Sequence, residues 1–284
     1  MRRTAIAVGI LFLTACGGSD SRPLVRVAVG GQAALRFLPV YLARELGLYE
    51  KAGMHVTIDS LSGSAKAMQA LLGGSADVAA GFYDQTIQIA AEGREVQSFV
   101  TLTRYLGFVA AAAPGTTKSI RRIEDLKGAV VGVAAPGSSG HLLLNYLLAS
   151  RGMQASDVST YSIGTGATSV TAMQRGTVDA GVIGDLVLSP LLRDNPNLAI
   201  LADTRSEQGI RATFGVSAYP GSVLYATGDW IRRHEDVVRR LSRVMQQTLR
   251  WAREQPAEQV REKLKAVYPG EDPSVLLEAL KGTI

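Results

Sequence analysis

Along most of the chain, short continuous runs of apolar residues alternate with longer segments in which apolar residues recur at a helical spacing. Short apolar runs bounded by glycine predict buried strands, and longer segments with apolar residues three and four positions apart predict helices. The first part of the chain gives strands at 24–30, 54–60, 76–81 and 96–104, and helices at 38–53, 63–74 and 84–93. This alternation is typical of a parallel sheet covered by helices on both faces.

The same pattern then begins again. Strands are predicted at 128–137, 158–164 and 179–185, with helices at 138–152 and 166–176. A shift of 102 residues places Gly74 on Gly176 and Asp77 on Asp179. The repeat predicts two similar α/β lobes, and the two aspartates, which lie inside the repeated turn, are interpreted as structural.

Three segments fall outside the repeat. Residues 113–128 are predicted to form a turn-rich link with a short helical part, and residues 202–215 are predicted to be irregular. The remainder is predicted to be helical, because apolar residues from Val237 to Ala252 recur on one face. Most arginines of this region lie off that stripe or at its edges, which indicates a solvent-exposed helix face.

The N-terminus has the layout of an export signal. Arg2 and Arg3 precede an apolar run over residues 5–13, and this run is shorter than the roughly 20 residues of a membrane span. The tetrad that ends at Cys16 resembles a lipobox, so we expect residues 1–15 to be a signal peptide and Cys16 to carry a lipid anchor. Residues 16–23 are then a flexible tether in the cell envelope, outside the cytoplasm.

Composition excludes several classes of protein. Cys16 is the only cysteine of the 284 residues, so no disulfide is expected, and three scattered histidines have no metal-ligand spacing. Loss of Arg2 and Arg3 leaves 28 basic against 25 acidic residues, and a formal charge of +3 in place of +5. A weakly basic exported chain is not expected to bind nucleic acid. We expect a monomer without metal or cofactor.

Polar and aromatic residues follow the predicted strands, where the carboxyl ends of a parallel sheet and helix N-termini bind ligands. The candidate binding residues are Gln32, Phe37, Gly63, Ser64, Tyr83, Asp84, Arg104, Ser138, Ser139, His141, Thr165, Asp185 and Phe214. Several have an ordinary alternative role. The hydroxyl residues also suit helix capping, and Tyr83 also suits simple packing. Asp84 and Asp185 accept a hydrogen bond from a ligand ammonium or hydroxyl group, or cap a helix.

Several longer segments carry a resemblance to a known family. They are FLPVYLARELGLYEKAGMHVTI, GSAKAMQALLGGSADVAAG, IEDLKGAVVGVAAPGSSGHLLLNYLLASRGM, TAMQRGTVDAGVIG and SAYPGSVLYATGDWI. The chain resembles the extracytoplasmic solute-binding proteins of ABC importers, in the branch that handles nitrate, sulfonates, taurine and thiamine-related pyrimidines. The resemblance implies a two-lobed α/β fold, the type II periplasmic-binding-protein fold, with the ligand in the cleft between the lobes. It implies one lobe from residues 24–114 and 207–284 and a second from 115–206.

The function implied by this resemblance is capture of a small polar organic solute and its delivery to an ABC permease and ATPase complex. Hydrogen-bonding loops and candidate carboxylates favour a sulfonate or taurine-like solute, or a thiamine-pyrimidine-like solute, over a bare oxyanion. The alternatives are a ligand-sensing lipoprotein without a transport role and an enzyme on the same scaffold. The sequence contains no Ser–His–Asp order, P-loop or HExxH motif, and no cysteine-rich motif of the related pyrimidine synthase type, so no enzyme is expected.

Overall fold

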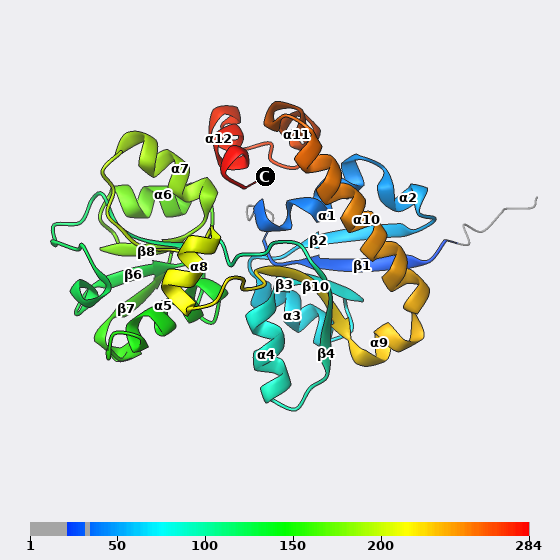
Figure 1. Ribbon diagram of the computed structural model, residues 1–284, viewed down its shortest axis with the longest axis horizontal. Helices are drawn as coiled ribbons and strands as arrows, with labels where there is room; N and C mark the ends of the chain where they lie inside the picture. The colour runs from blue at the N-terminus through cyan, green and yellow to red at the C-terminus, as the bar shows by residue number, and fades with distance from the viewer. Residues whose placement is uncertain (1–21, 32–34, 284) are drawn as a thin grey trace, which may run out of the picture.

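The computed structural model describes residues 22–31 and 35–283, and they form two lobes side by side (Figure 1). Each lobe is built on one five-stranded sheet. The first sheet contains β1 (Leu24–Val29), β2 (His55–Ser60), β3 (Val78–Phe82), β4 (Val96–Thr101) and β10 (Ser222–Thr227). The second sheet contains β5 (Val109–Ala112), β6 (Val130–Val133), β7 (Ser159–Ser162), β8 (Ala180–Ile183) and β9 (Ile200–Asp203). The two-lobed α/β prediction is therefore confirmed.

The two sheets have the same topology. Their strand orders are β2-β1-β3-β10-β4 and β7-β6-β8-β5-β9. In each sheet three strands pair in parallel, and one further strand, β10 or β5, runs antiparallel to both of its neighbours. This reversed strand lies next to a crossing between the lobes. The repeat inferred from the sequence is thus a repeat of whole lobes, not only of a turn.

Helices cover the faces of both sheets. Those that belong mainly to the first lobe are η1 (Leu35–Phe37), α1 (Leu38–Glu45), α2 (Leu48–Lys51), α3 (Ser64–Leu72), α4 (Tyr83–Ala91), α9 (Gly228–Arg233), α10 (Glu235–Glu254) and α11 (Ala257–Leu264). The second lobe carries η2 (Ile123–Leu126), α5 (Ser139–Ala149), η3 (Ala155–Asp157), α6 (Ala167–Gln174), α7 (Asp185–Asp194) and α8 (Glu207–Phe214). The last helix, α12 (Pro273–Thr283), packs on α11 and η1 of the first lobe and on α7 of the second. Figure 1 shows it in red between the two lobes.

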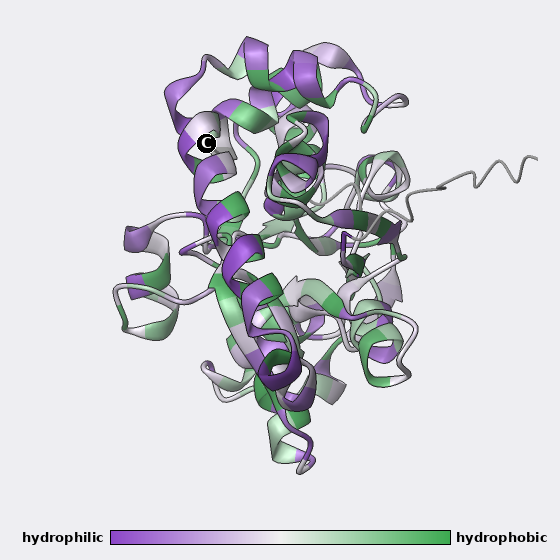
Figure 2. Ribbon diagram, turned by 90° about the vertical axis from the view of Figure 1, so that its right-hand side faces the viewer, coloured by the Kyte–Doolittle hydropathy of each residue, from purple (hydrophilic) through white to green (hydrophobic). Residues whose placement is uncertain are grey.

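The buried stripe of α10 follows the predicted pattern. Residues such as Val237, Leu241 and Met245 are buried against the first lobe. In Figure 2, hydrophilic and hydrophobic colours alternate along the helices that face the viewer, as expected for elements with one exposed side. The prediction of an exposed arginine face and an apolar stripe on this helix is confirmed.

The repeated aspartates have the structural role assigned to them. Asp77 accepts hydrogen bonds from the backbone N–H of Arg26 at 2.8 Å and from the guanidinium of the same residue. Asp179 accepts the backbone N–H of Val130 at 2.9 Å, in the corresponding strand of the second lobe. Each carboxylate therefore joins the turn before β3 or β8 to the neighbouring strand. Burial alone would raise the pKa of Asp77, but the contacts from Arg26 lower it overall.

Some sequence predictions differ from the structure. Residues 202–215, predicted to be irregular, contain the end of β9 and the helix α8, and the region predicted to be wholly helical begins with β10. The predicted helix 38–53 is divided at Gly47, whose φ of 64° is left-handed. β5 falls within the range expected for the first lobe but pairs in the second sheet, and α8 packs on β9. The crossings therefore lie near residues 102–108 and 204–221.

Candidate functional site

A small cavity of about 60 Å³ lies between the two lobes. The first lobe contributes residues from the end of β1, η1, the start of α3 and the end of β3. The second lobe contributes the starts of α5 and α7, the end of β8 and the loop before α6. The lining residues are Gly30, Leu35, Arg36, Gly63, Ser64, Phe82, Phe108, Ala134, Ser138, Ser139, Gly164, Thr165, Val182, Ile183, Gly184, Asp185, Leu186 and Val187. The cavity thus lies at the carboxyl ends of strands from both sheets, where open α/β sheets bind ligands.

Three helix N-termini line this cavity, those of α3, α5 and α7, and the loop before α6 lines it as well. The N-cap residues of α3 and α7 are glycines, so these caps offer no side-chain acceptor to the first-turn N–H groups. Helix N-termini carry a partial positive charge and free N–H groups, which together favour an anion. The backbone alone therefore makes the cavity suited to a negatively charged group.

Arg36 supplies a full positive charge at the same place. It lies in η1 of the first lobe and is only 5% exposed. Its Nε donates to the carbonyl oxygen of Leu106 at 3.0 Å, and its guanidinium carbon lies 4.3 Å from the ring centre of Phe108. Its Nη2 is buried and has no hydrogen-bond partner within residues 22–31 and 35–283. An unpaired buried guanidinium is costly, and an anion in the cavity would complete its hydrogen bonding.

Two glycines make room for this guanidinium. A Cβ atom on Gly107 would lie 2.6 Å from Arg36 Nε, and one on Gly184 would lie 3.0 Å from Arg36 Nη1. Gly107 also has a φ of 77°, which side-chain-bearing residues rarely adopt. Arg36 of the first lobe is therefore enclosed by the crossing segment and by the N-terminus of α7.

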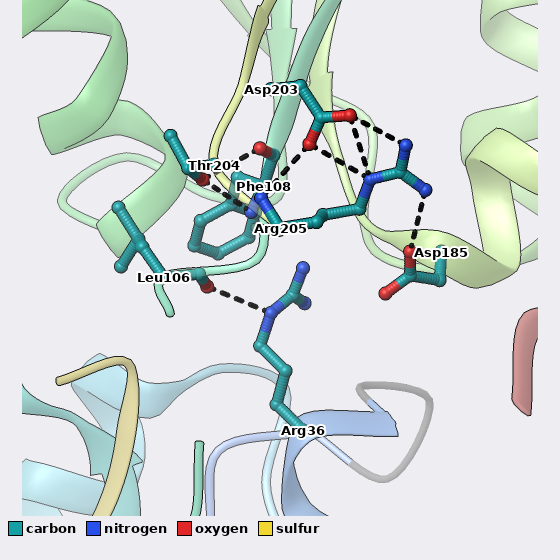
Figure 3. A network of polar contacts seen from close by, with 7 residues as sticks. All are labelled: Arg36, Leu106, Phe108, Asp185, Asp203, Thr204 and Arg205. Atoms are coloured by element: carbon teal, nitrogen blue, oxygen red, sulfur yellow. Dashed lines mark hydrogen bonds and ion pairs between the residues drawn. The ribbon is translucent and has the colours of Figure 1, made fainter. Parts of the chain in front are cut away.

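A network of charges on the second lobe faces Arg36 (Figure 3). Arg205 donates to both carboxylate oxygens of Asp203, with a shortest contact of 2.7 Å, and lies 3.4 Å from Asp185. Asp185 is 9% exposed and lines the cavity. Burial lowers the pKa of Arg36, while the charge of Asp185 raises it and that of Arg205 lowers it. Arg205 is thus matched by two carboxylates, whereas Arg36 has no carboxylate within ion-pair distance among the described residues.

One hydrogen bond joins the lobes directly beside the cavity. Ser139 Oγ, at the start of α5, donates to Asp84 Oδ1, at the start of α4, at 2.8 Å. Burial raises the pKa of Asp84, although the bond from Ser139 opposes this shift. The contact links the first turns of helices from different lobes and holds the cavity closed on that side.

The structure brings six of the predicted binding residues together around the cavity: Gly63, Ser64, Ser138, Ser139, Thr165 and Asp185. Asp84 contacts this group through Ser139. Arg104 is exposed and does not line this cavity, but it lines a second, adjoining cavity that is described below. Gln32 and Cys16 lie outside the described residues.

The other predicted residues have contacts elsewhere. Phe37 is buried in the core and packs on Phe82, with ring centres 5.5 Å apart. His141 accepts the N–H of Gly137 through Nδ1, and Phe214 stacks between Tyr146 and Tyr219. Tyr83 is half-buried at the start of α4 and does not line the cavity. A ligand role for these residues stays a prediction.

Sequence reasoning missed the residue that defines the charge of the site. Arg36 stands in an apolar stretch, ALRFLPV, and its contacts come from Leu106 and Phe108, about seventy positions later. An arginine inside an apolar run was the available signal, because such a residue is seldom buried without a partner. Phe108 was also missed.

Neither a metal centre nor a membrane span is found in the part of the chain that the structure describes. No three His, Cys, Asp or Glu side chains of residues 22–31 and 35–283 are grouped to hold a metal ion. Within the same residues, every helix is too short or too polar to cross a bilayer.

Comparison with known proteins agrees with this architecture. The family described as NMT1/THI5 like matches residues 34–259, so the chain belongs to that family. A protein of Bordetella bronchiseptica RB50 is 31% identical, with a TM-score of 0.83 over 92% of this chain and 82% of that one. The fold is that of the periplasmic solute-binding proteins of ABC transporters. Among curated proteins, no sequence matches the chain.

Two structural neighbours are named for what they bind. The periplasmic aliphatic sulphonate binding protein SsuA of Escherichia coli is 22% identical, with a TM-score of 0.71 over 93% of this chain and 84% of that one. The periplasmic nitrate-binding protein NrtA of Synechocystis PCC 6803 is 16% identical, with a TM-score of 0.65 over 86% of this chain and 66% of that one. At these identities the likeness shows the fold, and both neighbours are binding proteins.

Proposed function

We propose that this protein captures an organic sulfonate between its lobes and delivers it, chemically unchanged, to an ABC permease outside the cytoplasm. The observation that carries the proposal is Arg36, a buried guanidinium whose Nη2 has no partner among the described residues. It lines a cavity that three helix N-termini also line. A sulfonate oxygen at Nη2 would form the charge-assisted hydrogen bond that the site lacks.

The size and the lining of the cavity suit a small anionic group. A cavity needs about 10–15 Å³ of such volume to hold one water, so about 60 Å³ has room for roughly four to six, which is of the order of a small oxyanion. Arg36 already covers the face of Phe108, so a planar pyrimidine has little stacking surface there. The E. coli neighbour's sulphonate ligand and the Synechocystis neighbour's nitrate are both oxyanions, which is consistent with this assignment.

Taurine carries an amino group in addition to its sulfonate group, and the proposal assigns binding to the sulfonate group. Asp185 is the carboxylate that lines the cavity, and Arg205 already lies 3.4 Å from it. A ligand ammonium group would have to compete with Arg205 for this carboxylate. We therefore propose that the sulfonate group determines binding and that an amino group adds little.

A thermal-melt comparison tests this proposal. The soluble domain, from Gly17 onward, is melted with ethanesulfonate, taurine, nitrate and a thiamine-type pyrimidine. At about 100 times its dissociation constant, a ligand adds roughly 2.7 kcal/mol to the free energy of unfolding. For a chain of this size that raises Tm by roughly 5–10 °C. Ethanesulfonate is expected to give such a shift.

Arg36→Gln is the decisive variant, and Arg44→Gln is its matched control. Arg44 is an exposed arginine of the neighbouring helix α1, paired with Glu45. Arg36→Gln is expected to abolish the shift, because it removes the charge and the Nη2 donor that the sulfonate would bind. A cooperative melt of the free variant shows that it is folded. Arg44→Gln is expected to keep the shift. An Arg36→Gln protein that still responds fully to ethanesulfonate would refute the assignment.

A further inference from the structure

A second, larger cavity adjoins the first. It has a volume of about 560 Å³ and shares Leu35, Arg36 and Asp185 with the small cavity between the lobes. The guanidinium of Arg36 therefore stands at the junction of two spaces. One is of the size of an anionic group, and the other lies within the range of about 300–1,000 Å³ that is usual for organic ligands.

The wall of the second cavity is mainly apolar. It is formed mainly by η1, the start of α1, the end of β4 with the crossing segment after it, and the last turns of α10, and single residues of α7, α12 and the second crossing complete it. The apolar side chains on it are Leu35, Leu38, Pro39, Leu102, Leu249 and Ala252. Such a surface favours a hydrocarbon chain over water.

Among the residues that the structure describes, arginines outnumber carboxylates in the lining of this cavity, which contains four arginines and the single carboxylate of Asp185. Of these arginines, Arg104 and Arg253 are exposed to solvent. Throughout residues 22–31 and 35–283, neither forms an ion pair with a carboxylate, whereas Arg205 is held by Asp203 and Asp185. A ligand that fills the apolar space would thus lie beside two guanidinium groups that have no carboxylate partner.

We infer that the ligand is an elongated organic dianion. One anionic group lies at Arg36, the hydrocarbon body fills the second cavity, and a second anionic group contacts Arg104 and Arg253. This inference rests on the proposed function, because it uses Arg36 as the anchor of the first group. It adds a binding subsite and a ligand class, with two charges separated by an apolar chain.

Calorimetric titration with three sulfonates measures the contribution of each part of the ligand to affinity. Methanesulfonate fills the small cavity only, hexanesulfonate adds the hydrocarbon body, and 1,6-hexanedisulfonate adds the second charge. Each buried methylene strengthens binding about fourfold, so hexanesulfonate is expected to bind at least about tenfold more tightly than methanesulfonate. The second charge is expected to add about three- to fivefold, because the rim guanidiniums are exposed.

Three variants locate these gains. Leu249→Trp narrows the cavity and is expected to remove the advantage of hexanesulfonate while leaving methanesulfonate bound. Arg253→Gln is expected to remove the advantage of the disulfonate over hexanesulfonate. Arg250→Gln, a change on an exposed residue of the same helix that lines neither cavity, is expected to keep that advantage.

The outcomes distinguish this inference from the function on which it rests. If all three probes bind with the same affinity, the second subsite is refuted and the sulfonate site at Arg36 stands. If hexanesulfonate gains affinity but the disulfonate gains none, the dianion is refuted. If none of the probes binds, the proposed function fails together with the inference.

Discussion

Arg36 is the residue on which the account of the site depends. Its guanidinium is enclosed by the crossing segment and by Gly184, and the backbone of Gly184 has a φ of −105°, which alanine adopts without strain. The position of the charge, and not only its presence, is therefore open to test. A small side chain at residue 184 would press on Nη1.

Gly184→Ala is expected to weaken sulfonate binding roughly three- to tenfold, because a charge-assisted hydrogen bond loses strength when its donor is displaced. Calorimetric titration with ethanesulfonate measures the effect. Gly270→Ala is the control, since a Cβ there would meet no atom within 4 Å. Equal affinity of the Gly184→Ala and wild-type proteins would show that Arg36 does not bind the ligand as described.

The carboxyl group of Asp84 is buried beside the cavity, and its ionisation affects the stability of the fold. Its pKa is raised by burial, so ionisation of this carboxyl costs folding stability. The neutral carboxyl group makes its full contribution to the free energy of unfolding below the unfolded pKa of about 4. This contribution is lost as pH rises through the higher folded pKa. Asp84→Asn keeps an oxygen that accepts from Ser139 and cannot ionise.

Asp84→Asn is therefore expected to raise Tm by roughly 1–3 °C at pH 7, and this gain is expected to vanish toward pH 3.5. Melting curves across that range measure it. The exposed Asp59→Asn is expected to change Tm little. A gain that is constant with pH, or a loss at pH 7, would contradict the stated sign of the pKa shift.

At the scale of elements, the repeated turn fixes the same arrangement in both lobes. Asp179 ties the turn before β8 to Val130 of β6, and it also accepts from Thr116 and Lys118. Burial alone would raise the pKa of Asp179, but these hydrogen bonds lower it overall. The stabilisation of the folded state by the ionised Asp179 carboxylate is present above its unfolded pKa and is lost as pH falls through its lower folded pKa.

Asp179→Ala leaves the N–H of Val130 without this acceptor and is expected to cost about 1–3 kcal/mol. Its Tm at pH 7 should fall by several degrees below that of the wild type, with the difference shrinking as pH approaches 3. Asp194→Ala, which removes an exposed carboxylate, is the control. A Tm for Asp179→Ala within a degree of the wild type at pH 7 would contradict the structural role of the repeat.

The sequence predicted most of the elements that follow the repeat and missed those at the crossings. β5 reads VAAA and carries no alternation, and β10 joins its sheet only through pairing with β3 and β4, more than a hundred residues earlier. Such strands are specified by tertiary pairing, which a local period does not reveal. Six predicted binding residues line the cavity, because strand ends and helix starts can be located from the pattern. Arg36 could not be assigned in this way, since its environment is made by distant segments.

At the scale of the whole molecule, the site exists only where the two lobes meet. Arg36 comes from the first lobe, Asp185 from the second, and Ser139 bonds to Asp84 across the gap. The last helix, α12, packs on both lobes beside α7. Separation of the lobes would therefore open the cavity, and a ligand that contacts both lobes would favour the closed arrangement.

The most direct test is a crystal structure of the protein with ethanesulfonate. The account predicts the sulfonate between the lobes, with one oxygen about 2.7–2.9 Å from Arg36 Nη2 and others near the N-termini of α3, α5 or α7. A sulfonate bound elsewhere, with Arg36 Nη2 still unpaired, would contradict the central claim.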